Sequence, residues 1–304
     1  FSQGALVDFR RRLLHHGLHL RLVDRSVAVA KESGDFGYKQ LRVALDSAPL
    51  WGAGRVEDTF NLIGHALAVV VECAAAVVDL TAAEVRAAAG LELLGNSSLK
   101  ASLDIDWDDR EEQHRALQKL LAEVARLRAW VAEEVDPNHQ AAGPLRVALD
   151  QLQRVVEQDL EPDPDRDGHR IFRGTAKERQ ISICDPEMRH GRKSRSQVIK
   201  GYKRFLMKDM DHGVILGVAI QPANEPERNA CEDLREQARK YGEVVALFID
   251  RGFLASQWAK DLEAEGKKVV CRPWRPRNRG LFSKSDFAID LASKTVTCPA
   301  GTVV

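Results

Sequence analysis

The sequence predicts an α/β fold in which helices flank a mixed sheet and a large all-helical segment follows the first strand. Two short apolar runs, residues 41–46 and 244–250, each end in an aspartate and are typical of buried strands. Between them, residues 56–162 carry apolar side chains mostly at helical spacing. Two paired strands, a helix, a strand, a helix and a last strand are expected after this segment, which together predict a mixed sheet.

Length and composition indicate a soluble globular protein with roughly two domains, or one core that carries a large insertion. The chain has 304 residues, of which 44% are apolar and 30% charged, and its formal net charge is zero. Overall charge therefore indicates no class of partner. Five scattered cysteines, an odd number without a close pair, favour reduced thiols in a cytosolic compartment over a disulfide framework.

The start of the chain has the pattern of short helices. Apolar residues within residues 5–31 are spaced as in one or two amphipathic helices broken near Gly17. No signal peptide precedes them, and the pattern is already under way at Phe1, so we expect a piece of a longer protein that lacks both ends. After a turn comes the strand that ends in Asp46, and a loop is expected from Pro49 onward.

The most apolar run, residues 62–80, is long enough to cross a membrane. His65, Glu72 and Asp79 interrupt it at near-helical spacing, which indicates a polar stripe on a packed helix. We therefore expect no membrane contact. A second long amphipathic helix is expected over residues 110–135, after an acidic cluster that could cap it.

One hexapeptide occurs twice, at residues 41–46 and 145–150. Pro144 precedes the second copy and apolar residues continue after it at helical spacing, so this copy is expected in a helix. Pro49 follows the first copy and would stop a helix there. The same six residues should take two different structures, and Asp150 should be a solvated helix residue.

A polar, proline-broken linker at residues 161–168 ends the helical region. The elements expected beyond it are strands at 181–183, 202–207 and 214–220 with a hairpin turn at 209–213, helices at 225–241 and 254–265, strands at 244–249 and 268–271, and a β-hairpin at 287–297.

Asp46 and Asp250 are the candidate metal ligands. An aspartate at the carboxyl end of a buried strand lies at the edge where open α/β sheets place their ligands. On adjacent strands the two could share a divalent ion, because hard cations prefer carboxylate oxygens. From the residues alone, a turn or helix-cap role is the commoner explanation. Asp185 could pass for a further ligand, but Pro186 after it favours an Asx-Pro turn.

Two basic segments are candidates for contact with nucleic-acid phosphates, although basic runs are usually solvated surface. The second surrounds Trp274, whose ring could stack on or wedge a base. Arg251, directly after Asp250, is a further candidate. The first segment contains Arg189, His190, Arg192, Lys193, Arg195, Lys200, Lys203 and Arg204, and the second contains Arg272, Arg275, Arg277, Arg279 and Lys284.

Five sequence blocks follow one another: LDSAPLWGAGRVEDT at 45–59, DPEMRHGRKS at 185–194, GYK at 201–203, PAN at 222–224 and IDR at 249–251. Through these blocks the chain resembles, over about its whole length, the DDE transposases of bacterial insertion sequences, whose catalytic core has the ribonuclease H-like fold. The resemblance implies four parts. They are 1–35, the end of an N-terminal helical domain; 36–55, the first strand and loop of the core; 56–162, a helical insertion; and 163–304, the rest of the core, running into a truncated cysteine-containing insertion.

The resemblance implies that Asp46 and Asp250 are the first two catalytic carboxylates. The third, a glutamate on a later helix, is expected beyond residue 304, so the chain alone is expected not to cut DNA. Two Mg²⁺ ions, or Mn²⁺ in their place, would serve an in-line phosphodiester displacement in cleavage and strand transfer. The partner would be double-stranded DNA, as transposon ends and target, bound by a homodimer at the nucleoid in a bacterial cytoplasm.

Two other functions stay open. The chain could be a non-catalytic DNA-binding remnant of a transposase that keeps its basic surface, or a helical interaction protein whose α/β part is only a scaffold. Salt-dependent DNA binding would separate the last of these from the other two.

Overall fold

The computed structural model describes residues 2–34, 36, 40–95, 99–174, 176, 178–192, 196–272 and 280–304. Two compact units divide the chain. The first unit consists of Phe1–Asp46, Met207–Leu216 and Arg235–Val304, and the second of Ser47–Leu206 and Gly217–Leu234.

Short helices open the first unit, as the spacing of apolar residues predicts. They are α1 (Gln3–His15), η1 (Leu18–Arg21) and α2 (Leu22–Glu32). The Ser2 hydroxyl caps α1 by accepting the N–H of Ala5. Gly17 follows α1 with a φ of 64°, a left-handed conformation that glycine adopts without strain, so the break predicted there is confirmed.

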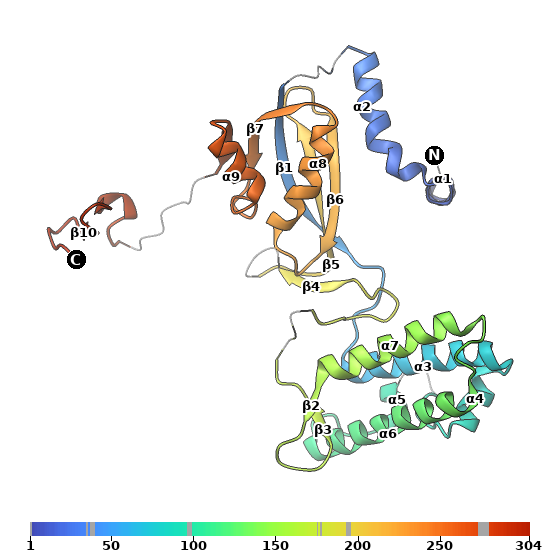
Figure 1. The fold of residues 1–304 in the computed structure, drawn as a ribbon. Coiled ribbons are helices and arrows are strands. Elements are labelled where there is room, and N and C mark those ends of the chain that lie inside the picture. The colour runs from blue at the N-terminus through green and yellow to red at the C-terminus, as the bar shows by residue number, and fades with distance from the viewer. Residues whose placement is uncertain are drawn as a thin grey trace. The chain divides into compact units, whose positions relative to one another are not determined.

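One six-stranded sheet carries Asp46 in one strand and Asp250 directly after another (Figure 1). Its strands are β1 (Gln40–Trp51), β4 (Arg189–Arg192), β5 (Val198–Asp209), β6 (Ile215–Pro222), β7 (Glu243–Ile249) and β8 (Lys268–Cys271). Their order is β4-β5-β1-β7-β8, and β6 also pairs with β5. β1 and β8 run parallel to β7, whereas β4 is antiparallel to β5, so the predicted mixed sheet is confirmed.

β1 is longer than predicted. Leu41, Val43 and Leu45 are buried on one face, in the alternation that a half-buried strand requires. The strand was expected to end at Asp46, but it continues to Trp51. Proline removes only one backbone donor, and a strand tolerates this where no neighbour needs that N–H, so Pro49 does not end β1.

Other boundaries also differ from the expected ones. The helix predicted over 225–241 is divided into η2 (Glu227–Ala230) and α8 (Cys231–Arg239), and the next helix is α9 (Gln257–Ala264). Residues 181–183 form no strand: both backbone groups of Ile183 bond to side chains, those of Glu57 and Gln151, and the carbonyl of Ile181 accepts the backbone N–H of Glu57. The predicted terminal hairpin is confirmed, with β9 (Ala288–Asp290) antiparallel to β10 (Thr295–Thr297) and η3 (Lys284–Asp286) before it.

Helices dominate the second unit. They are α3 (Thr59–Val78), α4 (Ala82–Ala88), α5 (Leu99–Leu103), α6 (Arg110–Glu134) and α7 (Ala142–Asp159), followed by a small hairpin of β2 (Leu160–Pro162) and β3 (His169–Ile171). Asp109 caps α6 by accepting two backbone N–H groups, as the acidic cluster predicts. The second copy of the hexapeptide lies in α7 and the first in β1, so the two predicted structures are confirmed.

α3 is the central helix of this unit. It packs against α4, α5, α6 and α7, and Figure 1 shows it beside α6 and α7. Among the described helices it alone is long and apolar enough to cross a membrane, by length and composition only. The core helix of a soluble protein passes the same test, and Leu62, Ile63 and Leu67 of α3 are fully buried within the helical core.

Glu123 of α6 is fully buried and holds the loop after α4. Its carboxylate accepts the backbone N–H groups of Glu92 at 2.7 Å and Leu93 at 3.1 Å, and Arg126 lies 3.4 Å away. Glu123→Ala leaves these donors unsatisfied, and each such group costs about 1–3 kcal/mol. We expect a loss of about 3 kcal/mol, measured by urea unfolding followed through the helical circular dichroism. Glu123→Gln keeps an acceptor and should lose clearly less; equal losses would contradict this explanation.

Candidate functional site

Asp46 lies in β1 and Asp250 directly follows β7, and these two strands pair in parallel in the first unit. Val43 of β1 lies opposite Leu247 of β7, and Ala44 lies opposite Phe248. If this register continued for two more residues, Asp46 would lie opposite Asp250. Side chains two residues apart point to the same face of a strand, so Asp46 shares the face of Ala44, and Asp250 follows the last residue of β7. Both aspartates are exposed to solvent.

Turn geometry holds Asp250 at the end of β7. Its Oδ1 accepts the N–H of Gly252 at 2.8 Å. Asp250 therefore has the turn-capping role that is common for an aspartate after a strand. Among the residues that the structure describes, Oδ2 has no hydrogen-bond partner. One carboxylate oxygen of Asp250 is therefore available to a ligand while the other fixes the side chain.

The neighbour of Asp46 is anchored within the second unit. Ser47 is buried, and its hydroxyl donates to Oε1 of Glu227 at 2.6 Å. Glu227 begins η2, after β6. This hydrogen bond fixes the position of β1 at the residue after Asp46. No local pattern in the sequence had indicated Glu227 as its partner.

The two aspartates have the donor chemistry of a hard-cation site. Neighbouring strands lie about 4.8 Å apart, which is close enough for two carboxylates to reach one ion at about 2.1 Å from each oxygen. Mg²⁺ usually takes one or two protein carboxylates and completes its shell with water and phosphate oxygens. In the described part of the chain, no group of three or more His, Cys, Asp or Glu side chains is placed to hold a metal. The pair thus fits a Mg²⁺ site that is completed by other ligands.

Three of the predicted phosphate-contact residues line one pocket of the second unit. His190, Arg192 and Lys203 meet there around a volume of about 560 Å³. Arg179 lines it too, although no sequence pattern had indicated this residue. Lys203 is buried, and its ammonium donates to the carbonyl of Glu225 at 2.8 Å, so it forms the inner wall of the pocket.

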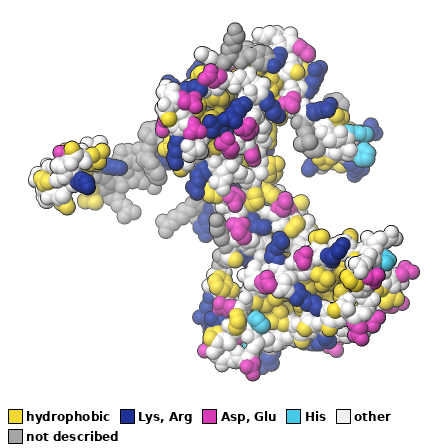
Figure 2. Space-filling model, viewed as in Figure 1, with side chains coloured by type: hydrophobic (Ala, Val, Ile, Leu, Met, Phe, Trp, Pro, Cys, Tyr) yellow, Lys and Arg dark blue, Asp and Glu magenta, His cyan; other side chains and the backbone are white. Residues whose placement is uncertain are grey.

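The other described residues that were predicted to contact phosphates lie outside this pocket. The guanidinium of Arg189 donates to the carbonyls of Pro186 and Met188, whereas Arg204 and Arg251 are exposed. On the face seen in Figure 2, basic and acidic side chains are interspersed. Lys193, Arg195 and Trp274 were also predicted to contact DNA and lie outside the described residues, as do Arg275, Arg277 and Arg279.

Asp185 has a structural role within the second unit. Its Oδ2 accepts the N–H of Ala53 at 2.9 Å, and its Oδ1 accepts the hydroxyl of Tyr202. Its carbonyl accepts the N–H of Met188, which closes the turn expected at Asp-Pro. Burial and the bond to Asp185 raise the pKa of Tyr202. Both carboxylate oxygens of Asp185 are engaged, which supports a turn residue over a third metal ligand.

His190 gives the basic pocket a pH dependence. Partial burial, together with the positive charges of Arg179 and Lys200, lowers the pKa of His190 below its ordinary value. Because the unfolded chain binds this proton first, stability is fully present above about pH 6.5 and decreases as pH falls from there toward the folded pKa.

His190→Gln should remove this part of the acid sensitivity. We expect the free energy of unfolding to fall less in the variant than in the unmodified chain between about pH 7.5 and about pH 5.5. Urea unfolding at both pH values measures the two differences. Equal falls in the two proteins would show that His190 does not contribute.

A comparison with known protein families gave a match over part of the chain. Residues 172–295 match the model of the family described as the transposase DDE domain. The matched range includes β4 to β9 with Asp250, whereas Asp46 precedes it. Comparisons with curated proteins and with solved structures gave no match. The similarity to the transposase DDE domain therefore covers residues 172–295 of the chain.

Proposed function

We propose that this chain takes part in metal-dependent DNA cleavage and strand transfer at the ends of an insertion sequence, with a ribonuclease H-like core. The proposal is supported by the parallel register of β1 and β7 in the first unit, which would bring Asp46 opposite Asp250 if it continued for two residues beyond Ala44 and Phe248. Two carboxylates on adjacent strands at one position of a sheet are suited to a divalent cation and have no comparable use in packing.

The fold supports the same proposal. A mixed sheet with helices is what a ribonuclease H-like core requires, and the helices α3 to α7 lie in the sequence between β1 and β5, where the helical insertion over 56–162 is proposed. Residues 36–55 and 163–304 would then supply the core itself.

Asp46 and Asp250 would hold Mg²⁺, or Mn²⁺ in its place. The ion supplies charge stabilisation and an activated oxygen nucleophile for an in-line displacement at phosphorus. The aspartates contribute negative charge, position and the open coordination places that water and phosphate can fill. On this proposal no side chain of the protein becomes covalently linked to DNA.

The partner would be double-stranded DNA, and the basic pocket of the second unit is the proposed phosphate contact. Arg192 is exposed at its edge, and Arg179 and His190 line its wall. Arg204 and Arg251 are exposed and would add phosphate contacts elsewhere. The chain would act at paired transposon ends as a homodimer, in a bacterial cytoplasm.

Titration of the purified chain with Mn²⁺ tests the proposal, because binding to Asp46 and Asp250 requires neither DNA nor a third carboxylate. Saturable binding that Mg²⁺ displaces is the expected result. DNA binding that decreases with salt, together with no saturable Mn²⁺ binding, would favour the alternative of a non-catalytic DNA-binding remnant.

A further inference from the structure

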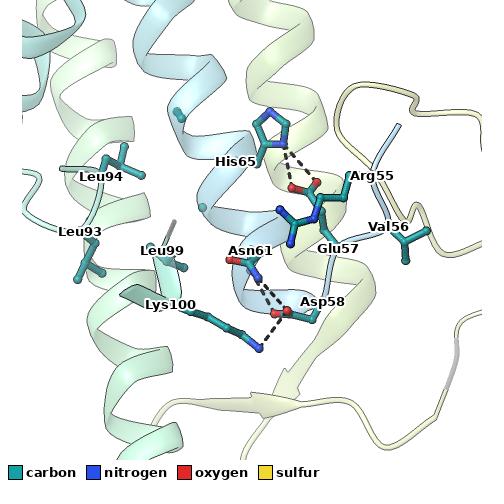
Figure 3. A pocket seen from close by; sticks show the side chains of 12 residues that line it. Arg55, Val56, Glu57, Asp58, Asn61, His65, Leu93, Leu94, Leu99 and Lys100 are labelled. Carbon is teal, nitrogen blue, oxygen red and sulfur yellow. Dashed lines mark hydrogen bonds and ion pairs between the residues drawn. The ribbon is translucent and has the colours of Figure 1, made fainter. Parts of the chain in front are cut away.

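Three reactive side chains meet in the second unit, two from around the start of α3 and one from a segment more than 100 residues later. Glu57 Oε1 and Oε2 lie 3.0 Å and 3.2 Å from Nδ1 of His65, and Figure 3 shows this pair. Nε2 of His65, on the other side of the ring, lies 3.8 Å from Sγ of Cys184. A carboxylate, an imidazole and a thiol in this order form the arrangement that activates nucleophiles in enzymes.

Local structure explains why the three meet. Glu57 comes just before α3, which Asp58 caps through the N–H groups of Phe60 and Asn61, and His65 lies within α3. The backbone N–H of Glu57 donates to the carbonyl of Ile181, and its Oε2 accepts the N–H of Ile183 at 3.4 Å. These two bonds hold the segment before Cys184 against the start of α3.

The carboxylate determines which nitrogen of His65 carries the proton. An ionised glutamate only accepts hydrogen bonds, so Nδ1 must donate to Glu57. In the neutral imidazole, Nε2 then keeps its lone pair and faces the sulfur of Cys184. His65 is therefore oriented to accept the thiol proton.

Exposure distinguishes Cys184 from other cysteines of the chain. Its side chain is exposed to solvent, whereas Cys231 is buried. Cys73 is half-buried, and burial together with the charge of Glu72 raises the pKa of its thiol. A thiol that is both exposed and next to a base is the type that exchanges with disulfides.

We propose that Cys184 is a thiol–disulfide exchange site for low-molecular-weight disulfides, with His65 as its base and Glu57 as the residue that positions His65. The sulfur of Cys184 attacks one sulfur of the disulfide, and its proton passes to Nε2 of His65. The new sulfur–sulfur bond joins Cys184 to one half of the disulfide. The other half leaves as a thiolate, and the proton on His65 passes to that thiolate or, where the thiolate is a weak base, to solvent, so no further oxidant or reductant is needed.

The test follows the reaction of the full chain with 5,5′-dithiobis(2-nitrobenzoic acid) at pH 7. The rate for Cys184 is the component that Cys184→Ser removes, and mass spectrometry of the peptide containing residue 184 confirms the adduct. A free cysteine is only a few per cent thiolate at pH 7, so loss of the base should lower this rate about 10-fold in His65→Gln.

Glu57→Gln tests the proposed orientation of His65 more specifically, because it leaves the imidazole in place. Its amide can donate to Nδ1, which would move the ring proton to Nε2 and leave no acceptor for the thiol, although the imidazole is still present. A loss of about 10-fold is therefore expected here too. The matched control is His169→Gln, which removes an exposed imidazole of the same unit and should leave the rate unchanged. Unchanged rates in the folded His65 and Glu57 variants would overturn the proposal.

A second measurement needs no folded variant. The rate of Cys184 in the unmodified chain is compared with that of a synthetic peptide of residues 180–188, which has the same neighbours but no His65 or Glu57. We expect the chain to react about 10-fold faster. A rate equal to or below that of the peptide would show that the imidazole gives no assistance.

Discussion

Asp46→Asn and Asp250→Asn are each expected to abolish measurable binding of Mn²⁺ to the chain. Loss of a residue that only supports a metal ligand already costs roughly 10–100-fold in affinity, and loss of a ligand should cost at least as much. Asparagine keeps the size of the side chain but removes its negative charge, so the change tests charge and not packing. Isothermal titration calorimetry with Mn²⁺ measures the affinity, and circular dichroism checks that each variant is folded.

The duplicated hexapeptide supplies the control for this experiment. Asp150 ends the same six residues as Asp46, is also exposed, and lies in α7 instead of β1. Asp150→Asn should leave Mn²⁺ binding unchanged, because this carboxylate has no counterpart on a neighbouring strand. If all three variants bind Mn²⁺ like the unmodified chain, Asp46 and Asp250 are not metal ligands.

The fold could be predicted from the sequence where one local signal was strong. Leu41, Val43 and Leu45 alternate with polar residues in β1, whereas Leu145 and Leu149 continue at helical spacing in α7. The context of the two identical hexapeptides was therefore enough to assign a strand to one and a helix to the other. The pairing of Asp46 with Asp250 stays a prediction: β1 and β7 are parallel as expected, but β1 continues past Asp46 to Trp51, whereas β7 ends just before Asp250.

The missing strand at residues 181–183 and the place of Arg179 depend on tertiary contacts with distant segments, which no local pattern reveals. Residues 181–183 alternate like a strand, but the side chains of Glu57 and Gln151 take up backbone groups of Ile183. Nothing near Arg179 in the sequence indicates that it lines a pocket or pairs with Asp159, 20 residues away. Side chains that hold one segment against another are visible only once the helices have packed.

Asp159→Ala is expected to cause the largest loss of stability in the second unit. Asp159 is buried at the end of α7, and both of its oxygens are bound by Arg179, at 2.7 Å and 2.5 Å. The hydroxyl of Thr59, at the start of α3, donates to the same carboxylate at 2.8 Å. Removing one partner of a buried, hydrogen-bonded ion pair costs about 3–5 kcal/mol, because the other charge remains without compensation.

Urea unfolding followed by the helical circular dichroism measures this loss, since α3 to α7 belong to the second unit. Glu92→Ala is the matched control: this carboxylate, in the loop after α4, lies 3.7 Å from Lys119 of α6, in a pair whose two side chains are both exposed. Such surface pairs contribute about 0–1 kcal/mol, so the control should lose little. Similar losses in the two variants would contradict a special role for Asp159.

Replacing both partners separates the ion pair from its components. In Asp159→Leu combined with Arg179→Met, no charge is left unpaired, and apolar replacement of a buried pair is often neutral or stabilising. The double variant should therefore be more stable than Asp159→Leu alone, although the hydroxyl of Thr59 loses its acceptor in both. If the double variant loses as much as the sum of the single losses, Asp159 and Arg179 act independently and their pairing does not stabilise the junction of α3 and α7.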